Sequence, residues 1–467
     1  MVTTAEQKSI QEIYLSQKAF FKTGVTKEVS WRIKQLKKIG KIIEENEAAI
    51  LDALYQDLRK NKYESLSLEI GPVYAELKHL LSHIKDWAEP ETVGTALFHI
   101  PGNSTIYKEP FGNVLLISPW NYPFLLTLSP LLGAISAGNC IVVKPSENSP
   151  NTSKLLVNLI NKNFDPGFVY CMEGGVELTQ ELLAKRWDYI FFTGGTEIGR
   201  IIYQAAAKHL TPVTLELGGK SPCIIDETAD IKLAAKRVAW GKWINAGQTC
   251  IAPDYVYVHK SVQEKFIDQL KRSVADMYSN APLQSKDYCK IINQRQYDRL
   301  KGYLTQVEIL YGGKYDDTEQ KIEPTILYNP PKDSSVMTEE IFGPILPIYT
   351  YENIDDVIAF INEREKPLAA YIFSKSSKTR EKFLNETSSG GVCLNDTVLH
   401  ISSNEMPFGG VGESGIGGYH GKSSFDTFTH HKSVLHRYPH YLDPYLRYAP
   451  YSPKKFGLMR FFLRKFL

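Results

Sequence analysis

The sequence lacks any grouping of cysteines that could build a disulfide framework or a zinc site. Its six cysteines lie far apart in a long chain, without a CxxC pair or a Cys/His cluster at zinc spacing. Isolated thiols are typical of a reduced protein, and most of them are expected to be small buried apolar residues. We therefore expect a cytoplasmic protein that holds no metal ion.

A strong excess of charge is also missing. The net charge is +2, and no block of Lys and Arg alternates with aromatic residues, which disfavours nucleic acid as a partner. Residues 1–14 alternate polar and charged side chains and lack the apolar core of a signal peptide. Export from the cell is therefore not expected.

One long stretch contains no charged residue. It runs from Phe111 to Val143, which is long enough to suggest a membrane span. Three prolines, Pro119, Pro123 and Pro130, interrupt it. Because proline breaks helices, we expect broken elements buried inside the protein instead.

The length of 467 residues exceeds one ordinary hydrophobic core and suggests two or three domains. The first ninety residues repeat apolar side chains at helical steps, as from Leu66 through Ile70 to Leu80, which predicts helices that end at Pro90. Strand-like and helix-like segments then alternate. This alternation predicts a doubly wound parallel sheet, whose ligands bind beyond the carboxyl ends of its strands.

A second α/β region is predicted from near Pro212 to near Asn395. The last seventy residues are interpreted as irregular structure with one strand. Along the chain, the expected strands are 104–107, 114–117, 140–143, 189–192, 255–258 and 434–436, and the expected helices are 125–137, 153–161, 198–209 and 262–277.

Two segments carry a nucleophile and a base. Cys250 lies in Asn245-Ala-Gly-Gln-Thr-Cys-Ile-Ala-Pro253, and Glu216 begins Glu216-Leu-Gly-Gly-Lys-Ser-Pro222. Small residues around a thiol let a carbonyl compound approach and let backbone N–H groups turn toward it. This pairing indicates an enzyme that works through a covalent thioester. A lone Cys250 would otherwise be interpreted as a buried apolar residue.

Two further segments fit a dinucleotide. Phe192-Thr-Gly-Gly-Thr-Glu-Ile-Gly199 follows a predicted strand and opens a helix, where N–H groups attract phosphate, although a bare strand-to-helix turn is the alternative. Lys144-Pro-Ser-Glu147 follows another strand. Lys144 could donate to ribose hydroxyls and Glu147 accept from one, or the segment is a solvated loop.

The last two segments each have a local alternative. Pro119-Trp-Asn-Tyr-Pro123 holds Asn121 between two prolines, so its amide is either an oxyanion donor or an ordinary turn residue. Glu339-Glu-Ile-Phe-Gly-Pro344 places an acid and a ring beside a turn. These could bind a ribose and a planar ligand, or form a surface turn over a core Phe.

Together these segments resemble the aldehyde dehydrogenase superfamily in order and spacing over nearly the whole chain. The ending Pro407-Phe-Gly-Gly-Val-Gly-Glu-Ser-Gly415, followed by Tyr419-His-Gly-Lys422, is similar to the class 3 branch. That branch oxidises medium- to long-chain aliphatic and aromatic aldehydes and is typically homodimeric. The resemblance implies a small-molecule aldehyde substrate, a homodimer, and NAD or NADP as coenzyme.

The resemblance also implies a domain arrangement. A Rossmann-type cofactor domain would span residues 1–211, with 90–107 contributing to a small β oligomerisation arm. An α/β catalytic domain carrying the nucleophile would span 212–395. Residues 396–467 would return to the cofactor and oligomerisation region and end in a tail.

Site roles follow from the same resemblance. Cys250 becomes the nucleophile, Glu216 the general base, and Asn121 an oxyanion donor together with the Cys250 N–H. Glu340 is a second candidate for the base. The implied cofactor-binding residues are Trp120, Lys144, Glu147, Thr193, Gly194, Gly195, Gly199, Leu217, Glu340 and Phe342.

Two points stay open in this comparison. The family usually has Ser or Asn at the position of Gly195, so a side-chain contact near the cofactor is missing. Glu147 would repel a 2′-phosphate and favour NAD, yet class 3 enzymes with this acid accept either coenzyme. The choice between NAD and NADP therefore stays open.

Other functions remain to be weighed. A thiol esterase could use Cys250 and Glu216 without a coenzyme, and a CoA-acylating dehydrogenase would resolve the thioester with CoA, although Glu216 as a water base argues against it. A structural protein on this fold would be expected to lose Cys250 or Glu216.

The tail from Lys454 to Leu467 carries apolar residues among five basic ones. It could make weak contact with an anionic membrane surface, which would make the protein peripheral, or pack against the protein itself or across a dimer.

Overall fold

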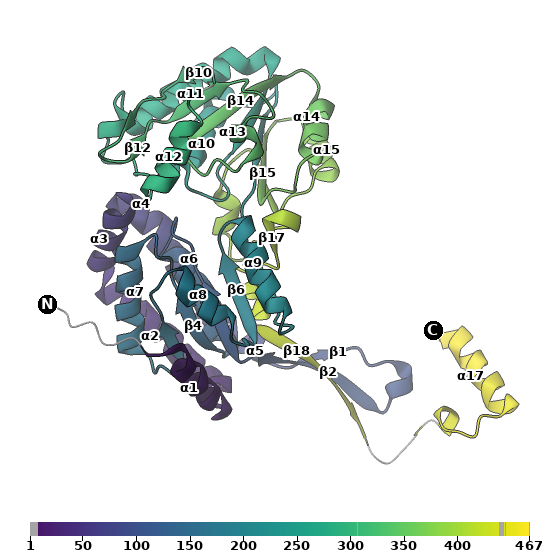
Figure 1. The fold of residues 1–467 in the computed structure, drawn as a ribbon. Helices are drawn as coiled ribbons and strands as arrows, with labels where there is room; N and C mark the ends of the chain where they lie inside the picture. The colour runs from purple at the N-terminus through teal and green to yellow at the C-terminus, as the bar shows by residue number, and fades with distance from the viewer. Residues whose placement is uncertain (1–7, 306, 439–442, 444, 467) are drawn as a thin grey trace. The chain divides into compact units, whose positions relative to one another are not determined.

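The structure is a computed structural model that describes residues 8–305, 307–438, 443 and 445–466 (Figure 1). The chain forms two compact units. The first contains the chain up to Trp87 together with Pro110–Thr429, and the second contains Ala88–Glu109 and the chain from His430 onward. Every catalytic residue inferred above belongs to the first unit.

The N-terminal part is helical, as its periodicity predicts. Ile70, Val73, Leu77 and Leu80 are buried, whereas Leu66 is 43% exposed and does not belong to the apolar face as expected. The reason is local: a π-helical turn at Leu66–Ile70 shifts the helical register there. The helices are α1 (Ile10–Lys22), α2 (Val29–Glu45), α3 (Glu47–Leu58), α4 (Lys62–Ser65) and α5 (Gly71–Ala88).

A six-stranded sheet forms the first half of the fold. Its order is β17-β7-β6-β3-β4-β5, with parallel pairing throughout except for β17. The strands are β3 (Asn113–Ile117), β4 (Cys140–Lys144), β5 (Val169–Cys171), β6 (Tyr189–Thr193), β7 (Val213–Glu216) and β17 (Gly415–Ile416). The connecting helices are α6 (Leu125–Ala137), α7 (Pro150–Asn163), α8 (Val176–Leu183) and α9 (Thr196–Ala207).

Both faces of this sheet are buried, which confirms the doubly wound prediction. Leu115 and Val142 belong to one apolar cluster, while their neighbours Val114 and Ile141 belong to the other. The uncharged run 111–143 supplies β3, α6 and β4, all nearly fully buried. None of the described helices combines the length and the apolarity needed to cross a bilayer.

A seven-stranded sheet of order β10-β13-β14-β9-β8-β15-β16 forms the second half, and only β10 runs antiparallel to its neighbour. The strands are β8 (Pro222–Ile225), β9 (Tyr255–His259), β10 (Ile309–Tyr311), β13 (Thr325–Tyr328), β14 (Ile345–Tyr351), β15 (Ala369–Phe373) and β16 (Gly391–Leu394), beside a short pair, β11 (Tyr315–Asp316) and β12 (Lys321–Ile322). The helices of this half are α10 (Ile231–Trp243), α11 (Gln263–Tyr278), α12 (Gln294–Gly302), α13 (Ser335–Thr338), α14 (Ile354–Asn362) and α15 (Ser377–Glu386).

The remaining elements are a three-stranded sheet and C-terminal helices. The sheet has the order β1-β2-β18, formed by β1 (Glu91–Val93), β2 (Gly102–Pro110) and β18 (Thr429–Arg437). The last seventy residues are less irregular than expected, because α16 (Lys422–Thr427) and α17 (Pro453–Phe466) form in addition to the predicted strand. In α17, Phe456, Met459 and Leu463 recur at helical spacing, which explains the helix. The predicted domain boundaries at 211 and 395 stay a prediction.

Candidate active site

Cys250 follows a turn of unusual backbone conformation. After α10, residues Asn245, Ala246 and Gly247 all have positive φ, at 51°, 51° and 76°. A Cβ on Gly247 would lie 2.2 Å from the Gly343 carbonyl oxygen, so only glycine fits there. The turn thus presents Cys250 next to the loop that carries Glu340.

The Cys250 thiol is half-buried. Its pKa is raised to about 12, chiefly by burial and also by the charges of Glu340 and Glu216, although the backbone N–H groups of Cys250 and Ile251 oppose this shift. The thiol is therefore protonated at neutral pH. It needs a nearby base to become the nucleophilic thiolate.

Glu216 lies at the carboxyl end of β7. Its side chain is 2% exposed, and neither carboxylate oxygen has a hydrogen-bond partner among the described residues. Burial raises the pKa of this carboxyl group well above its ordinary value. Its backbone is fixed on both sides, since its carbonyl accepts from Gly194 N–H at 3.0 Å and Gly415 pairs with it across the sheet. A buried carboxyl group without partners is suited to exchange a proton with a reacting group.

Glu340 is the second acid beside the thiol. A Cβ on Gly218 would lie 2.2 Å from a Glu340 carboxylate oxygen, so the carboxylate rests directly on that glycine. The Glu340 pKa is raised to about 8, chiefly by burial and also by the charge of Asp254, although a hydrogen bond from Gly219 N–H opposes this shift. The structure therefore brings Cys250, Glu216 and Glu340 together.

Asn121 is tied to the segment that carries the nucleophile. Its side-chain Nδ2 donates to the Gln248 backbone carbonyl at 3.1 Å, and the Asn121 backbone carbonyl accepts from Asn245 Nδ2 at 2.8 Å. Next to it, the Tyr122 hydroxyl lies 2.8 Å from Thr249 Oγ1. One N–H of the Asn121 amide is thus anchored, which leaves the second for an oxygen beside Cys250.

The inferred cofactor residues lie at the carboxyl ends of the first sheet. Lys144 ends β4 and its Nζ contacts Glu147 Oε2 at 2.6 Å, and Thr193 ends β6. The Trp120 and Phe342 rings meet edge to face with centroids 5.3 Å apart. Leu217 is buried and packs against Gly199, where a Cβ would lie 2.7 Å from it.

The start of α9 tests whether these residues fit a dinucleotide. Gly194 and Gly195 lead into the helix, and no side chain of the described chain caps its first N–H groups. A Cβ on Gly195 would meet no atom of the described ranges within 4 Å, so this helix start is open. Free N–H groups at a helix N-terminus suit a phosphate. The residues therefore fit NAD or NADP.

The structure also reveals residues that sequence reasoning missed. Asn245 and Gln248 organise the nucleophile turn, and three buried charged residues, Lys60, Glu64 and Glu69, lie behind it. Nothing in the sequence around these three residues indicates that they are buried. The described residues hold no group of three His, Cys, Asp or Glu side chains placed to bind a metal ion.

One edge of the first sheet fits a dinucleotide, and a thiol that can bond to a carbonyl carbon lies next to it. This is the arrangement of a dehydrogenase. The chain belongs to the aldehyde dehydrogenase family, whose model matches residues 1–434. This membership confirms the fold class, the enzyme class and NAD(P) as the coenzyme of the family. It does not support the coenzyme-independent thiol esterase.

Individual relatives agree with this membership. The chain is 47% identical to 4,4'-diaponeurosporen-aldehyde dehydrogenase of Staphylococcus aureus, over 97% of this chain and 99% of the relative. It is 45% identical to the dimeric NADP-preferring aldehyde dehydrogenase of Rattus norvegicus, over 91% and 94%. Several other relatives at 44–46% identity are named family 3 aldehyde dehydrogenases. Among solved structures, the substrate-bound state of Staphylococcus aureus AldH superposes with a TM-score of 0.95 at 46% identity, covering 98% of this chain and 100% of that one.

Proposed function

We propose that this aldehyde dehydrogenase oxidises long apolar aldehydes through a thioester on Cys250. The observation that carries the mechanism is the half-buried Cys250 thiol near the carboxyl group of Glu216, which has no hydrogen-bond partner among the described residues. The substrate class is the one that the resemblance to the class 3 branch implies, and a relative at 47% identity is named 4,4'-diaponeurosporen-aldehyde dehydrogenase.

The residues divide the reaction into two stages. The Cys250 thiol passes its proton to the carboxylate of Glu340 beside it, Sγ bonds to the aldehyde carbon, and the resulting oxyanion accepts hydrogen bonds from Asn121 Nδ2 and the Cys250 N–H. When bound, NAD(P) supplies the hydride acceptor, and Lys144, Glu147 and the open start of α9 would hold it. Glu216 then takes a proton from the water molecule that attacks the thioester, which releases the carboxylic acid and the free thiol.

Chain length provides the test of the substrate class. Each buried methylene contributes about 0.8 kcal/mol, so kcat/KM is expected to rise by about tenfold or more from butanal to decanal. Initial rates with a series of aliphatic and aromatic aldehydes, each with NAD and with NADP, measure this dependence and the coenzyme preference. A flat or falling series would contradict the proposal.

The oligomeric state is proposed from the name of a relative and from an exposed apolar face. We propose a homodimer, because the rat relative is named a dimeric aldehyde dehydrogenase. Helix α9 also leaves Ile198 and Ile201, one turn apart on the same face, about half exposed, and a second copy could cover this face. Light scattering on the purified chain measures the mass directly, and a monomer would contradict the proposal.

We further propose a cytoplasmic protein whose tail touches membrane surfaces. Helix α17 exposes Phe456, Phe461 and Leu463 next to five basic residues, which suits an anionic lipid surface. All six cysteines are free thiols, in keeping with a reduced compartment.

Truncation after Pro453 tests the role of the tail. The full chain is expected to float with phosphatidylglycerol vesicles and not with phosphatidylcholine ones, because the attraction is partly electrostatic. The truncated chain should stay at the bottom of the gradient while it oxidises butanal normally. Equal flotation of both chains would refute membrane contact through α17.

A further inference from the structure

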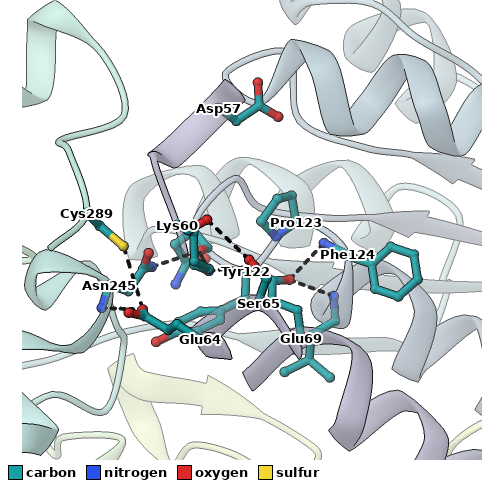
Figure 2. Close-up of polar contacts among 12 residues, drawn as sticks. Asp57, Lys60, Glu64, Ser65, Glu69, Tyr122, Pro123, Phe124, Asn245 and Cys289 are labelled. Atoms are coloured by element: carbon teal, nitrogen blue, oxygen red, sulfur yellow. Dashed lines mark hydrogen bonds and ion pairs between the residues drawn. The ribbon is translucent and has the colours of Figure 1, made fainter. Parts of the chain in front are cut away.

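Three charged side chains, those of Lys60, Glu64 and Glu69, are buried near the turn of residues 245–247 that precedes Cys250 (Figure 2). In the sequence they lie between α3 and α5. Lys60 and Glu69 are 0% exposed, and Glu64 is 9% exposed. Charged groups are rarely buried without partners, because transfer from water is costly. Each of these three groups therefore has a structural or functional reason to be inside.

Lys60 and Glu69 support the Asn121 loop. Lys60 Nζ lies 2.6 Å from Glu69 Oε1 and 3.3 Å from the Asn121 carbonyl oxygen, and 4.2 Å from the centre of the Tyr122 ring. The other carboxylate oxygen of Glu69 accepts from the N–H groups of Phe124 and Leu125, at 3.1 and 3.0 Å. This pair holds the loop from behind, and each of its charged nitrogen and oxygen atoms has at least one hydrogen-bond partner.

Glu64 supports the other half of the site. Its Oε1 accepts from the Asn245 N–H at 2.8 Å and from the Cys289 thiol at 3.7 Å. Asn245 is the first residue of the left-handed turn that precedes Cys250. Because a left-handed asparagine is held only by its surroundings, the Glu64 hydrogen bond fixes where this turn begins.

Asn245 joins the two halves. Its Nδ2 donates to the Asn121 carbonyl at 2.8 Å and to the Gln248 carbonyl at 3.1 Å, and the Asn121 amide donates to that same Gln248 oxygen at 3.1 Å. A rotation of Asn245 would therefore move the Asn121 amide relative to Cys250. The Asn121 amide and the Cys250 N–H are the two donors assigned to the oxyanion.

We propose that Glu64 is a positioning residue for the oxidation: by holding the Asn245 N–H, it sets the alignment of the Asn121 amide with the Cys250 thiol. This inference rests on the roles proposed for Cys250 and Asn121. Glu64 itself touches neither the thiol nor the Asn121 amide. Its effect passes through Asn245.

Two substitutions at this position separate the hydrogen bond from the charge. Glu64→Gln keeps an oxygen that accepts from Asn245 N–H, so its burst of reduced coenzyme should stay within about threefold of wild type. Glu64→Leu removes the acceptor, and its burst is expected to slow by about 10- to 100-fold, since small misplacements of catalytic groups have effects of this size.

A second reaction, of the Cys250 thiol, distinguishes a loss of alignment from a general loss of structure. Alkylation of Cys250 by iodoacetamide forms no oxyanion, so its rate in Glu64→Leu should stay within about threefold of wild type. The KM for the coenzyme should also be unchanged. Asp226→Leu, which removes a buried carboxylate bonded to Thr228 and Ser374, is the matched control and should lower thermal stability without slowing the burst.

The outcomes are distinct. A normal burst in Glu64→Leu, a slow burst in Glu64→Gln, or alkylation that falls in parallel with the burst would each overturn the positioning role. If Glu64→Leu is insoluble, Glu64→Ala removes the same acceptor with a smaller side chain and makes the same test. None of these results would affect the proposed nucleophile, which is tested separately by removing the Cys250 thiol.

Discussion

Replacing Cys250 by alanine is expected to lower the rate of aldehyde oxidation by about 10⁴-fold or more, as for other enzymes that lose their nucleophile. The reason is that Asn121 and Glu216 have no covalent adduct on which to act once the sulfur is gone. The rate of coenzyme reduction with saturating aldehyde, measured by absorbance, provides the value. The variant should still bind the coenzyme, because the residues of β4, β6 and α9 are untouched.

Cys393→Ala is the matched control for this loss. Cys393 is the other thiol that is only partly buried, so it would share any non-specific effect of removing a sulfur atom. Its activity should equal that of wild type. Retained oxidation in Cys250→Ala, or loss in Cys393→Ala, would mean that the nucleophile has been assigned to the wrong residue.

Glu216→Gln is expected to separate the two stages of the reaction. Thioester formation should still give a burst of reduced coenzyme close to one equivalent per site, whereas the steady rate should fall by about 10²- to 10⁴-fold, because no base activates water. Stopped-flow absorbance resolves the two phases. A variant that lost the burst itself would show that Glu216 acts before the thioester forms.

The pH dependence of the steady rate gives a second measurement on the same variants. Only the deprotonated carboxylate can accept a proton, and burial raises the Glu216 pKa. The wild-type rate of thioester hydrolysis should therefore rise with pH, and the rise should vanish in Glu216→Gln. Glu340, with its pKa raised to about 8, is the alternative source of such a rise. A flat wild-type profile, or an unchanged rise in Glu216→Gln together with its loss in Glu340→Gln, would assign the base role elsewhere.

The elements that sequence reasoning predicted best are those whose pattern is local. The expected helix 125–137 has the same bounds in the structure, and strands β3, β4, β6 and β9 differ from expectation by a residue or so at their ends. Long apolar runs between prolines and glycines leave few alternatives for such segments. Leu66 was misplaced because a π-helical turn shifts the register, which periodicity does not indicate.

The residues of the candidate site also divide into those that a local sequence pattern indicates and those that it does not. Cys250, Glu216 and Asn121 could be found because small residues or prolines frame each of them within a few positions. Glu64 and Lys60 could not, because the spacing of a charged residue on a helix does not show whether a second layer of structure covers that face. The left-handed turn at Asn245 depends on partners more than a hundred residues away, and only the folded chain brings them together.

The pairing of Gly415 with Glu216 has a consequence for the order in which the enzyme matures during translation. Strand β7 remains an open edge of its sheet until the ribosome has delivered β17, about 200 residues later. A nascent polypeptide therefore displays its thiol well before the strand that carries its proton acceptor is covered on both sides.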